Sequence, residues 1–280
     1  MKKLNKRHII DIGSLILRTL FFLVFIAPLL WLVVSSFKQE MNIFKDMGSL
    51  SAFIPKDLFL GNYTKAFQRA DLIKYVMNSM FYVFLITLFG MIVNSLCGYG
   101  LAKLKVPYSK QILKFIIALI IIPFETIILP LFLIVNNFGW VNSFQALIVP
   151  FIANCFNIYL FKQFFSGIPD EFLEAARVDG ASDLRTFLQI VLPQSTTVFA
   201  TVFILTFVAH WGDFMWPLIV ASDDSVRTIQ VGLQFLFTNP PQLYGVILAG
   251  LTFSTIPLAI IFLMFQKYYV QSAASSGLKG

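Results

Sequence analysis

Two carboxylates inside long apolar runs are the first candidates for chemistry in this sequence. Glu125 lies in the segment Pro123-Phe-Glu-Thr126, and Asp213 lies in the segment His210-Trp-Gly-Asp-Phe-Met-Trp216. A charged side chain at membrane depth costs roughly 3 kcal/mol or more, so each carboxylate should face a cavity or a partner. The sequence therefore predicts polar sites within the apolar part of the chain.

Two interpretations of these carboxylates remain open. In the first, they line a polar translocation path with Trp211 and Trp216, whose flat rings suit the apolar faces of a sugar, and Asn154 is a weaker candidate for the same path. In the second, Asp213 caps or braces a kinked helix, the tryptophans are interfacial anchors, and Asn154 makes an interhelical hydrogen bond. A related hypothesis makes Glu125 and Asp213 proton carriers of an ion-coupled secondary transporter that acts alone.

Motifs typical of enzymes are missing from the sequence. No G-x-x-x-x-G-K-[ST] segment occurs, so ATP must be hydrolysed by a partner, and no H-E-x-x-H segment occurs. The two histidines, His8 and His210, lack the spacing of metal ligands. An intramembrane aspartyl protease would need a second aspartate beside Asp213 in the spans. We therefore expect no catalytic residue, no metal site and no cofactor bound by this chain.

A polar stretch from Ile168 to Gln194 interrupts the second half of the chain. It holds five of the fourteen acidic residues, Asp170, Glu171, Glu174, Asp179 and Asp183, between apolar flanks. Such a segment must lie in water between membrane spans. Its pattern predicts two short helices joined at a glycine, because Pro169 suits a first helical turn and Gly180 suits a helix end.

The second of these helices should begin at Ser182, whose hydroxyl can cap it, and should end where Pro193 breaks the run. Its apolar stripe would consist of Leu184, Phe187, Leu188 and Val191. On the first helix, Ala176 and Gly180 lie one turn apart, so another backbone could approach closely. From the residue pattern alone, an amphipathic connector on the bilayer surface remains an alternative.

Composition places the whole chain in a membrane. The 280 residues are 58% hydrophobic and only 12% charged, far below the roughly 25% charged residues of soluble proteins. The net charge of +7 comes from scattered lysines and arginines without a basic stripe, so nucleic acid is not an expected partner, whereas membrane lipid is. Cys97 and Cys155 both fall in apolar runs and indicate neither a disulfide framework nor a metal site.

Six apolar runs are long enough to cross a bilayer. They cover residues 14–37, 75–101, 111–135, 143–165, 198–220 and 244–269, the third being interrupted by Pro123 and Pro130. We therefore predict an all-α, polytopic membrane protein with six transmembrane helices. In the second run, Gly98, Gly100 and Ala102 should permit close helix packing. A cleaved signal peptide is the alternative for the first run, but that run is too long and lacks a small-residue cleavage site.

Lysine and arginine counts orient these spans. They favour a cytoplasmic location for both termini, the loop after the second span and the polar stretch, with the first external loop as the one exception. The predicted organisation is a cytoplasmic amino terminus (1–13), a transmembrane permease domain (14–270) and a cytoplasmic tail (271–280). Within the domain we expect an external loop (38–74) and a cytoplasmic loop (166–195).

Several motifs resemble one family, the membrane subunits of binding-protein-dependent ABC importers. The polar stretch matches the "EAA" loop of that family as E174-A-A-x3-G180-x9-I190-x-L-P193, with the spacing intact. The resemblance extends over nearly the whole chain and is closest to the carbohydrate branch, including the smaller membrane subunit of the maltose system. It is carried further by Asn62-Tyr63, N94-S-L-C-G-Y-G-L-A, W211-x-D213-F-x-W216 with Pro217 and Leu218, and G277-L-K-G280.

This resemblance implies a type I ABC importer permease in a bacterial cell membrane. It implies four kinds of partner: a second homologous permease, two cytoplasmic ATPase subunits that bind ATP and Mg, an external solute-binding protein and a sugar substrate. It also implies that the loop docks in a groove of the ATPase, with Glu174 as the charged contact. The residues of this ATPase-coupling site would be Glu174, Ala175, Ala176, Asp179 and Gly180.

Overall fold

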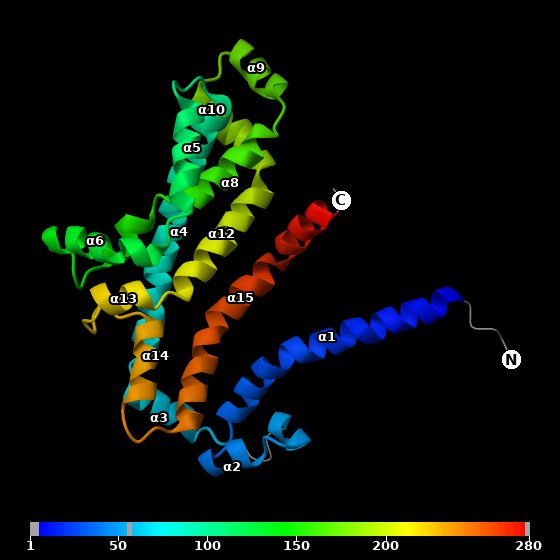
Figure 1. The fold of residues 1–280 in the computed structure, drawn as a ribbon, viewed down its shortest axis with the longest axis vertical. Coiled ribbons are helices and arrows are strands. Elements are labelled where there is room, and N and C mark those ends of the chain that lie inside the picture. Colours follow the sequence, from blue (N-terminus) through cyan, green and yellow to red (C-terminus); the bar gives the residue numbers. More distant parts are fainter. Residues whose placement is uncertain (1–5, 55–57, 278–280) are drawn as a thin grey trace. The chain divides into compact units, whose positions relative to one another are not determined.

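The computed structural model describes residues 6–54 and 58–277 of the chain. Every regular element in this part is a helix, so the all-α prediction is confirmed (Figure 1). The amino-terminal lysines at positions 2 and 3 and the last three residues of the closing G277-L-K-G280 motif lie outside the described residues. The helices divide into two compact units, Met1–Leu72 with Gly232–Ile256, and Ile73–Val231 with Pro257–Gly280.

Four segments are long and apolar enough to cross a membrane. They belong to α1 (Lys6–Ser36), α4 (Leu72–Lys103), the segment Phe144–Ser166 and α15 (Tyr244–Gly277). Two further pairs of helices pass the same test together but are sharply bent. The number of spans reaches the predicted six when each bent pair is taken as one span.

The third predicted span is the first bent pair. α5 (Ser109–Ile120) and α6 (Phe124–Asn137) meet at 101°. Pro123 precedes α6 in an extended conformation, since a proline restricts the backbone and donates no hydrogen bond. Pro130, which we also expected to interrupt the span, lies inside α6 instead. Prolines are tolerated within membrane helices where neighbouring groups satisfy the freed backbone carbonyls.

The fifth predicted span, 198–220, is not one helix. α12 (Thr196–Trp211) ends at Gly212, and a separate short helix, α13 (Met215–Val220), follows it. The region between α13 and α15, predicted as an external loop, contains a further apolar helix, α14 (Ile229–Thr238). The fourth span combines α7 (Phe144–Ile148), η2 (Val149–Phe151) and α8 (Cys155–Ser166).

The first unit is organised around Asn62, in α3 (Gly61–Arg69). Its side-chain amide donates to the carbonyl oxygens of Ser36 at 2.8 Å and Lys38 at 2.7 Å, just after α1. A Cβ at Gly245 would lie 2.6 Å from the same amide, so only glycine lets the start of α15 approach. The carboxylate of Glu40, in α2 (Glu40–Lys45), accepts from the Tyr244 and Gly245 N–H groups. The Asn62-Tyr63 pair thus joins three helices.

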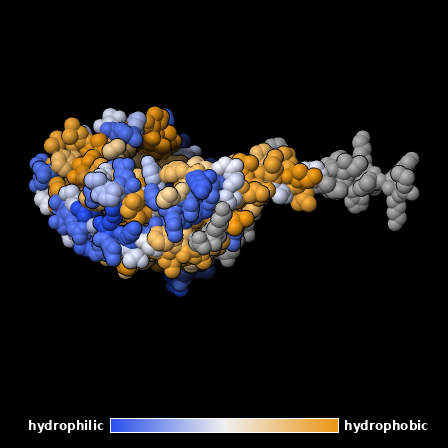
Figure 2. All heavy atoms as spheres, turned by 90° about the horizontal axis from the view of Figure 1, so that it is seen from below, coloured by the Kyte–Doolittle hydropathy of each residue, from blue (hydrophilic) through white to orange (hydrophobic). Residues whose placement is uncertain are grey.

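In α1, no residue from Gly13 to Val34 is buried, although Ser35 and Ser36 at its end are. Hydrophobic side chains cover the helix that leads to the grey terminal residues (Figure 2). Such a surface requires lipid or another apolar partner.

The second unit contains an aromatic cluster at one end of α4. Its buried members are Tyr99, Phe161, Phe165, Ile168, Leu173, Phe187, Val191, Val198 and Val202. Beside it, α4 and α8 come so close that a Cβ at Gly98 would lie 2.6 Å from Phe161 Cβ and 2.9 Å from the Lys162 backbone nitrogen. The predicted close packing is correct for Gly98 but wrong for Gly100, which faces open space on another side of the helix.

Candidate functional site

The polar stretch forms a short helix, α9 (Asp170–Val178), between two backbone breaks. Gly167 ends α8, and Pro169 precedes α9. Asp170 and Glu171 stand in the first turn, where carboxylates interact favourably with the helix dipole. At the other end, the N–H groups of Gly180 and Ala181 bond to the carbonyls of Arg177 and Ala176 at 3.0 and 2.9 Å, with Gly180 at φ +77°. This is the glycine-terminated helix that the sequence predicted.

α9 has one face toward the protein and one face toward its surroundings. Leu173 and Ala176 are buried, at 3% and 6% exposure, and Leu173 joins the aromatic cluster. Four of the five residues predicted to contact an ATPase are exposed, and only Ala176 packs inward. The exposed four are Glu174, Ala175, Asp179 and Gly180. Val178 stands beside them at 88% exposure, an apolar side chain in open space.

The second half of the stretch differs in part from the prediction. The Ser182 hydroxyl accepts from the Arg185 N–H at 3.3 Å and caps α10 (Asp183–Thr186), as expected. A π-helix, η3 (Phe187–Val191), then leads into α11 (Leu192–Gln194). Pro193 does not break the helix, because the helical run continues from Asp183 through the π-helical turn to Gln194. The chain bends by 82° after Gln194 instead.

The predicted apolar stripe of this half is divided. Phe187 and Val191 are buried in the aromatic cluster. Leu184 and Leu188 instead line an apolar cavity of about 340 Å³, together with Leu192 and residues of α4.

Both tryptophans of the predicted translocation path pack inside the protein. Trp216 is 1% exposed, and its indole N–H donates to the Ala146 carbonyl at 3.0 Å. Trp211 is 3% exposed, and its ring stacks on Phe207 with a centroid distance of 5.6 Å. In this structure these rings are therefore covered by protein and offer no face to a solute.

The polar residues of the same prediction lie at the starts of three helices, and the segments around them meet where Phe124 packs against Phe151 and Trp216. The Asn154 side chain accepts from the Asn157 N–H at 3.0 Å at the start of α8, and Asp213 accepts from the Trp216 N–H at 3.4 Å at the start of α13. Glu125 is exposed in the first turn of α6. Their role in translocation stays a prediction.

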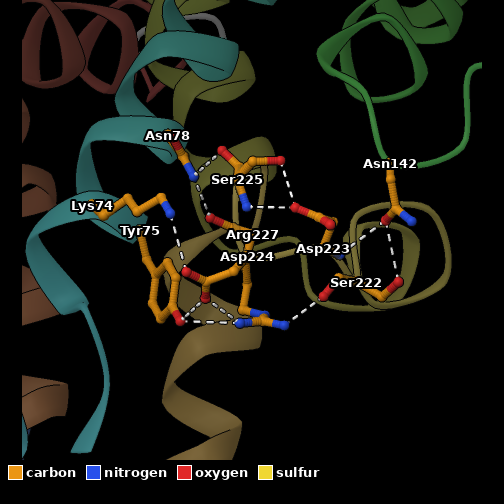
Figure 3. Close-up of polar contacts among 9 residues, drawn as sticks. All are labelled: Lys74, Tyr75, Asn78, Asn142, Ser222, Asp223, Asp224, Ser225 and Arg227. Carbon is orange, nitrogen blue, oxygen red and sulfur yellow. Dashed lines mark hydrogen bonds and ion pairs between the residues drawn. The ribbon is translucent and has the colours of Figure 1, made fainter.

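A polar network that the sequence did not reveal holds the loop between α13 and α14. Asp224 accepts hydrogen bonds from Tyr75, from Lys74 at 3.0 Å and from Arg227 at 2.5 Å (Figure 3). The Asn78 amide donates to the carbonyls of Ser225 and Arg227, both at 3.0 Å. The start of α4 is thereby bonded to a loop about 150 residues away in the chain.

The same loop is held from a second side. Asn142, which has a positive φ of 59°, accepts from the Ser222 hydroxyl at 3.1 Å and the Asp223 N–H at 2.9 Å (Figure 3). The hydrogen bonds from Ser225 lower the pKa of Asp223 below its ordinary value. Those from Tyr75 and Lys74 lower the pKa of Asp224. Both carboxylates are therefore held in their charged form.

These features together define a class of protein. Long apolar helices, sharply bent spans and a short amphipathic helix between two breaks describe a polytopic membrane permease. Among the described residues, no group of His, Cys, Asp or Glu side chains is arranged to hold a metal ion.

Comparison with known proteins gives the family. Residues 94–274 match the model of the binding-protein-dependent transport system inner membrane component, and the chain belongs to this family. It is thus a permease subunit of a binding-protein-dependent importer and a membrane protein. The alternative of a secondary transporter acting alone is not favoured.

Relatives of similar length agree with this assignment. The chain is 32% identical to the arabinooligosaccharides transport system permease protein AraQ of Halalkalibacterium halodurans, over 92% of this chain and 94% of that protein. It is 30% identical to the trehalose/maltose transport system permease protein MalG of Thermococcus litoralis, over 98% of each. A chain from the crystal structure of a bacterial ABC transporter involved in the import of the acidic polysaccharide alginate has the same fold, with a TM-score of 0.81 at 22% identity, over 96% of this chain and all of that one.

Proposed function

We propose that this chain imports a sugar or an oligosaccharide. Two relatives that align over nearly their whole length support this proposal. One is named as a permease for arabinooligosaccharides and the other as a permease for trehalose and maltose. The resemblance of its motifs to the carbohydrate branch of the family points the same way.

The energy for import comes from partners in this proposal. Two ATPase subunits on the cytoplasmic side bind ATP and Mg, a second homologous permease completes the membrane part, and a solute-binding protein delivers the substrate from outside. The absence of a P-loop from the sequence supports a separate ATPase. Both termini lie in the cytoplasm of a bacterial cell in this arrangement.

The observation that carries the proposal is the exposed face of α9. Glu174, Ala175, Asp179 and Gly180 are exposed, whereas Ala176 is buried and Leu173 attaches the helix to the aromatic cluster. A small, exposed helix with small side chains fits closely into a groove of a partner. Closure of the ATPases on ATP would then move α9 and, through the cluster, the spans.

Substitutions at Gly180 test this coupling. No atom lies within 4 Å of a Cβ at this position, so a larger side chain would meet only a partner, although φ +77° strains every residue except glycine. We expect Gly180→Ala to reduce binding-protein-stimulated ATPase activity moderately. Gly180→Trp should abolish that stimulation and sugar uptake, because the ring occupies the space of the docked ATPase.

Gly139→Ala is the matched control for backbone strain, since Gly139 also has a positive φ, 68°, and open space around it. Membrane insertion, measured by the amount of purified protein, should be the same for all three variants. Wild-type stimulation in Gly180→Trp would contradict the coupling role of α9.

A further inference from the structure

Lys103, the last residue of α4, is bonded to the hinge that precedes α9. Its ammonium nitrogen lies 2.5 Å from the Ile168 carbonyl oxygen and 2.5 Å from Asp170 Oδ1. The Lys103 side chain is 5% exposed, whereas that of Asp170 is 74% exposed. The buried partner of Lys103 is therefore the Ile168 carbonyl, and the Asp170 carboxylate bonds to the same ammonium group from the solvent side.

The hinge is also held by two backbone hydrogen bonds, from the Gly167 and Ile168 N–H groups to the Phe164 and Phe165 carbonyls at 3.0 and 3.1 Å. It consists of Gly167, Ile168 and Pro169, between the end of α8 and the start of α9. Ile168 contributes its side chain to the aromatic cluster, and its carbonyl is bonded by Lys103. A glycine permits many backbone conformations, so release of the carbonyl would loosen the hinge, and α9 would then be held through its buried Leu173 and Ala176.

α4 is well placed to move as one body with α9. Tyr99, one turn before Lys103 and on the same face of α4, packs against Phe165 and Phe187 of the cluster. Gly98 allows the backbone of α8 to approach α4 closely. α4 thus contacts α8 through Tyr99 and Gly98, and it contacts the start of α9 through Lys103.

We propose that Lys103 is a positioning residue for energy coupling, which locks the hinge so that movement of α9 is transmitted to α4. This inference rests on the proposed docking of α9 to an ATPase. At its other end α4 holds the loop 222–227 through Lys74, Tyr75 and Asn78, so a displacement of α9 reaches the opposite end of the second unit through one helix.

The test uses the complete transporter with its ATPases and binding protein in liposomes. Lys103→Met should leave copurification of the ATPases and basal ATP hydrolysis unchanged. It should lower the ratio of stimulated to basal ATPase activity about 2- to 30-fold, the range found for residues that carry coupling. Lys103→Arg, which keeps a long cation, should recover most of the ratio.

Two controls separate charge from position. Asp170→Asn should have a smaller effect than Lys103→Met, because Lys103 retains its bond to the Ile168 carbonyl. Lys110→Met removes an exposed cytoplasmic lysine from α5 and should leave the ratio unchanged.

A distance measurement tests the same proposal without a change at Lys103. Spin labels are placed on the native Cys97 of α4, which is free and exposed, and on Glu171→Cys of α9, with Cys155 replaced by serine. The distance between the labels should be the same in nucleotide-free and ATP-bound transporter, and should differ between the two states in Lys103→Gln. A change of this distance while Lys103 is present would overturn the proposal.

The outcomes distinguish the role of Lys103 from the coupling role of α9. If Gly180→Trp uncouples the transporter but Lys103→Met does not, only the role of Lys103 is wrong. If neither substitution changes the stimulated ATPase activity, the coupling role of α9 is wrong as well.

Discussion

At the scale of single residues, many polar side chains in this protein form hydrogen bonds with the ends of helices or with loops. Asn154 and Ser182 accept from the first N–H groups of α8 and α10, and Asp213 does the same for α13. Asp224 instead collects three donors from two distant segments. A carboxylate in a sequence dominated by apolar residues therefore need not lie on a substrate path.

The lowered pKa of Asp224 predicts a pH dependence of the loop 222–227. A carboxyl group with a folded pKa below its ordinary 3.8 stabilises the folded loop above that value, and this stabilisation is lost as the pH falls through the lowered pKa. We expect hydrogen exchange of the loop backbone to accelerate between roughly pH 5 and pH 2, relative to α12, as the hydrogen bonds from Tyr75 and Lys74 are lost.

Asp224→Asn, measured at each pH, is the reference for that experiment. The variant should exchange faster at neutral pH and show little further change in acid. An identical pH response in the wild-type protein and the variant would assign the effect to another group, of which Asp223 is the nearest candidate.

At the scale of elements, proline and glycine determine where the helices bend and approach. Pro123 separates α5 from α6, whereas Pro130 and Pro193 are accommodated within helices. Gly98 and Gly100, two residues apart on α4, have opposite surroundings. The effect of a proline or glycine on a helix therefore depends on the residues packed around it, and not on the residue type alone.

Alanine substitutions at these two glycines should have opposite signs. Gly98→Ala places a Cβ within 2.6 Å of Phe161 Cβ, so we expect a loss of about 1–3 kcal/mol of stability from overpacking. Gly100→Ala meets no atom and should gain about 0.5–1 kcal/mol, since alanine loses less backbone entropy in a helix. Thermal unfolding in detergent measures both, and a lower Tm for Gly100→Ala would be inconsistent with the open space beside it.

At the scale of the whole molecule, the chain has surfaces that are complete only in an assembly. α1 buries no residue from Gly13 to Val34, and α9 exposes Val178 and Phe172 at 88% and 49%. Family membership accounts for both features, since a permease subunit works with other components.

Reconstitution of the chain alone tests this dependence on partners. We expect no sugar uptake driven by a pH gradient, because the chain belongs to a family of components of binding-protein-dependent transport systems. When a partner ATPase subunit is expressed with the chain, the ATPase should copurify. Gradient-driven uptake without ATP would restore the hypothesis of a secondary transporter.

Local features were predicted well from the sequence. The apolar runs gave the helical spans to within a few residues for α1, α4 and α15, because burial in lipid requires a fixed length of apolar helix. α9, its start after Pro169 and its end at Gly180 also followed from residues in direct sequence. The family was predicted because its motif lies in this same continuous stretch.

Contacts between distant segments could not be predicted in this way. The burial of Trp216 depends on Ala146 and Phe124, and the bond from Lys103 depends on where the hinge at Ile168 lies. The network around Asp224 joins residues about 150 positions apart. The sequence by itself determined most of the spans and the helix α9 of the polar stretch, because these depend on neighbouring residues. Only the tertiary structure decided which polar groups meet, because packing of the helices brings their partners together.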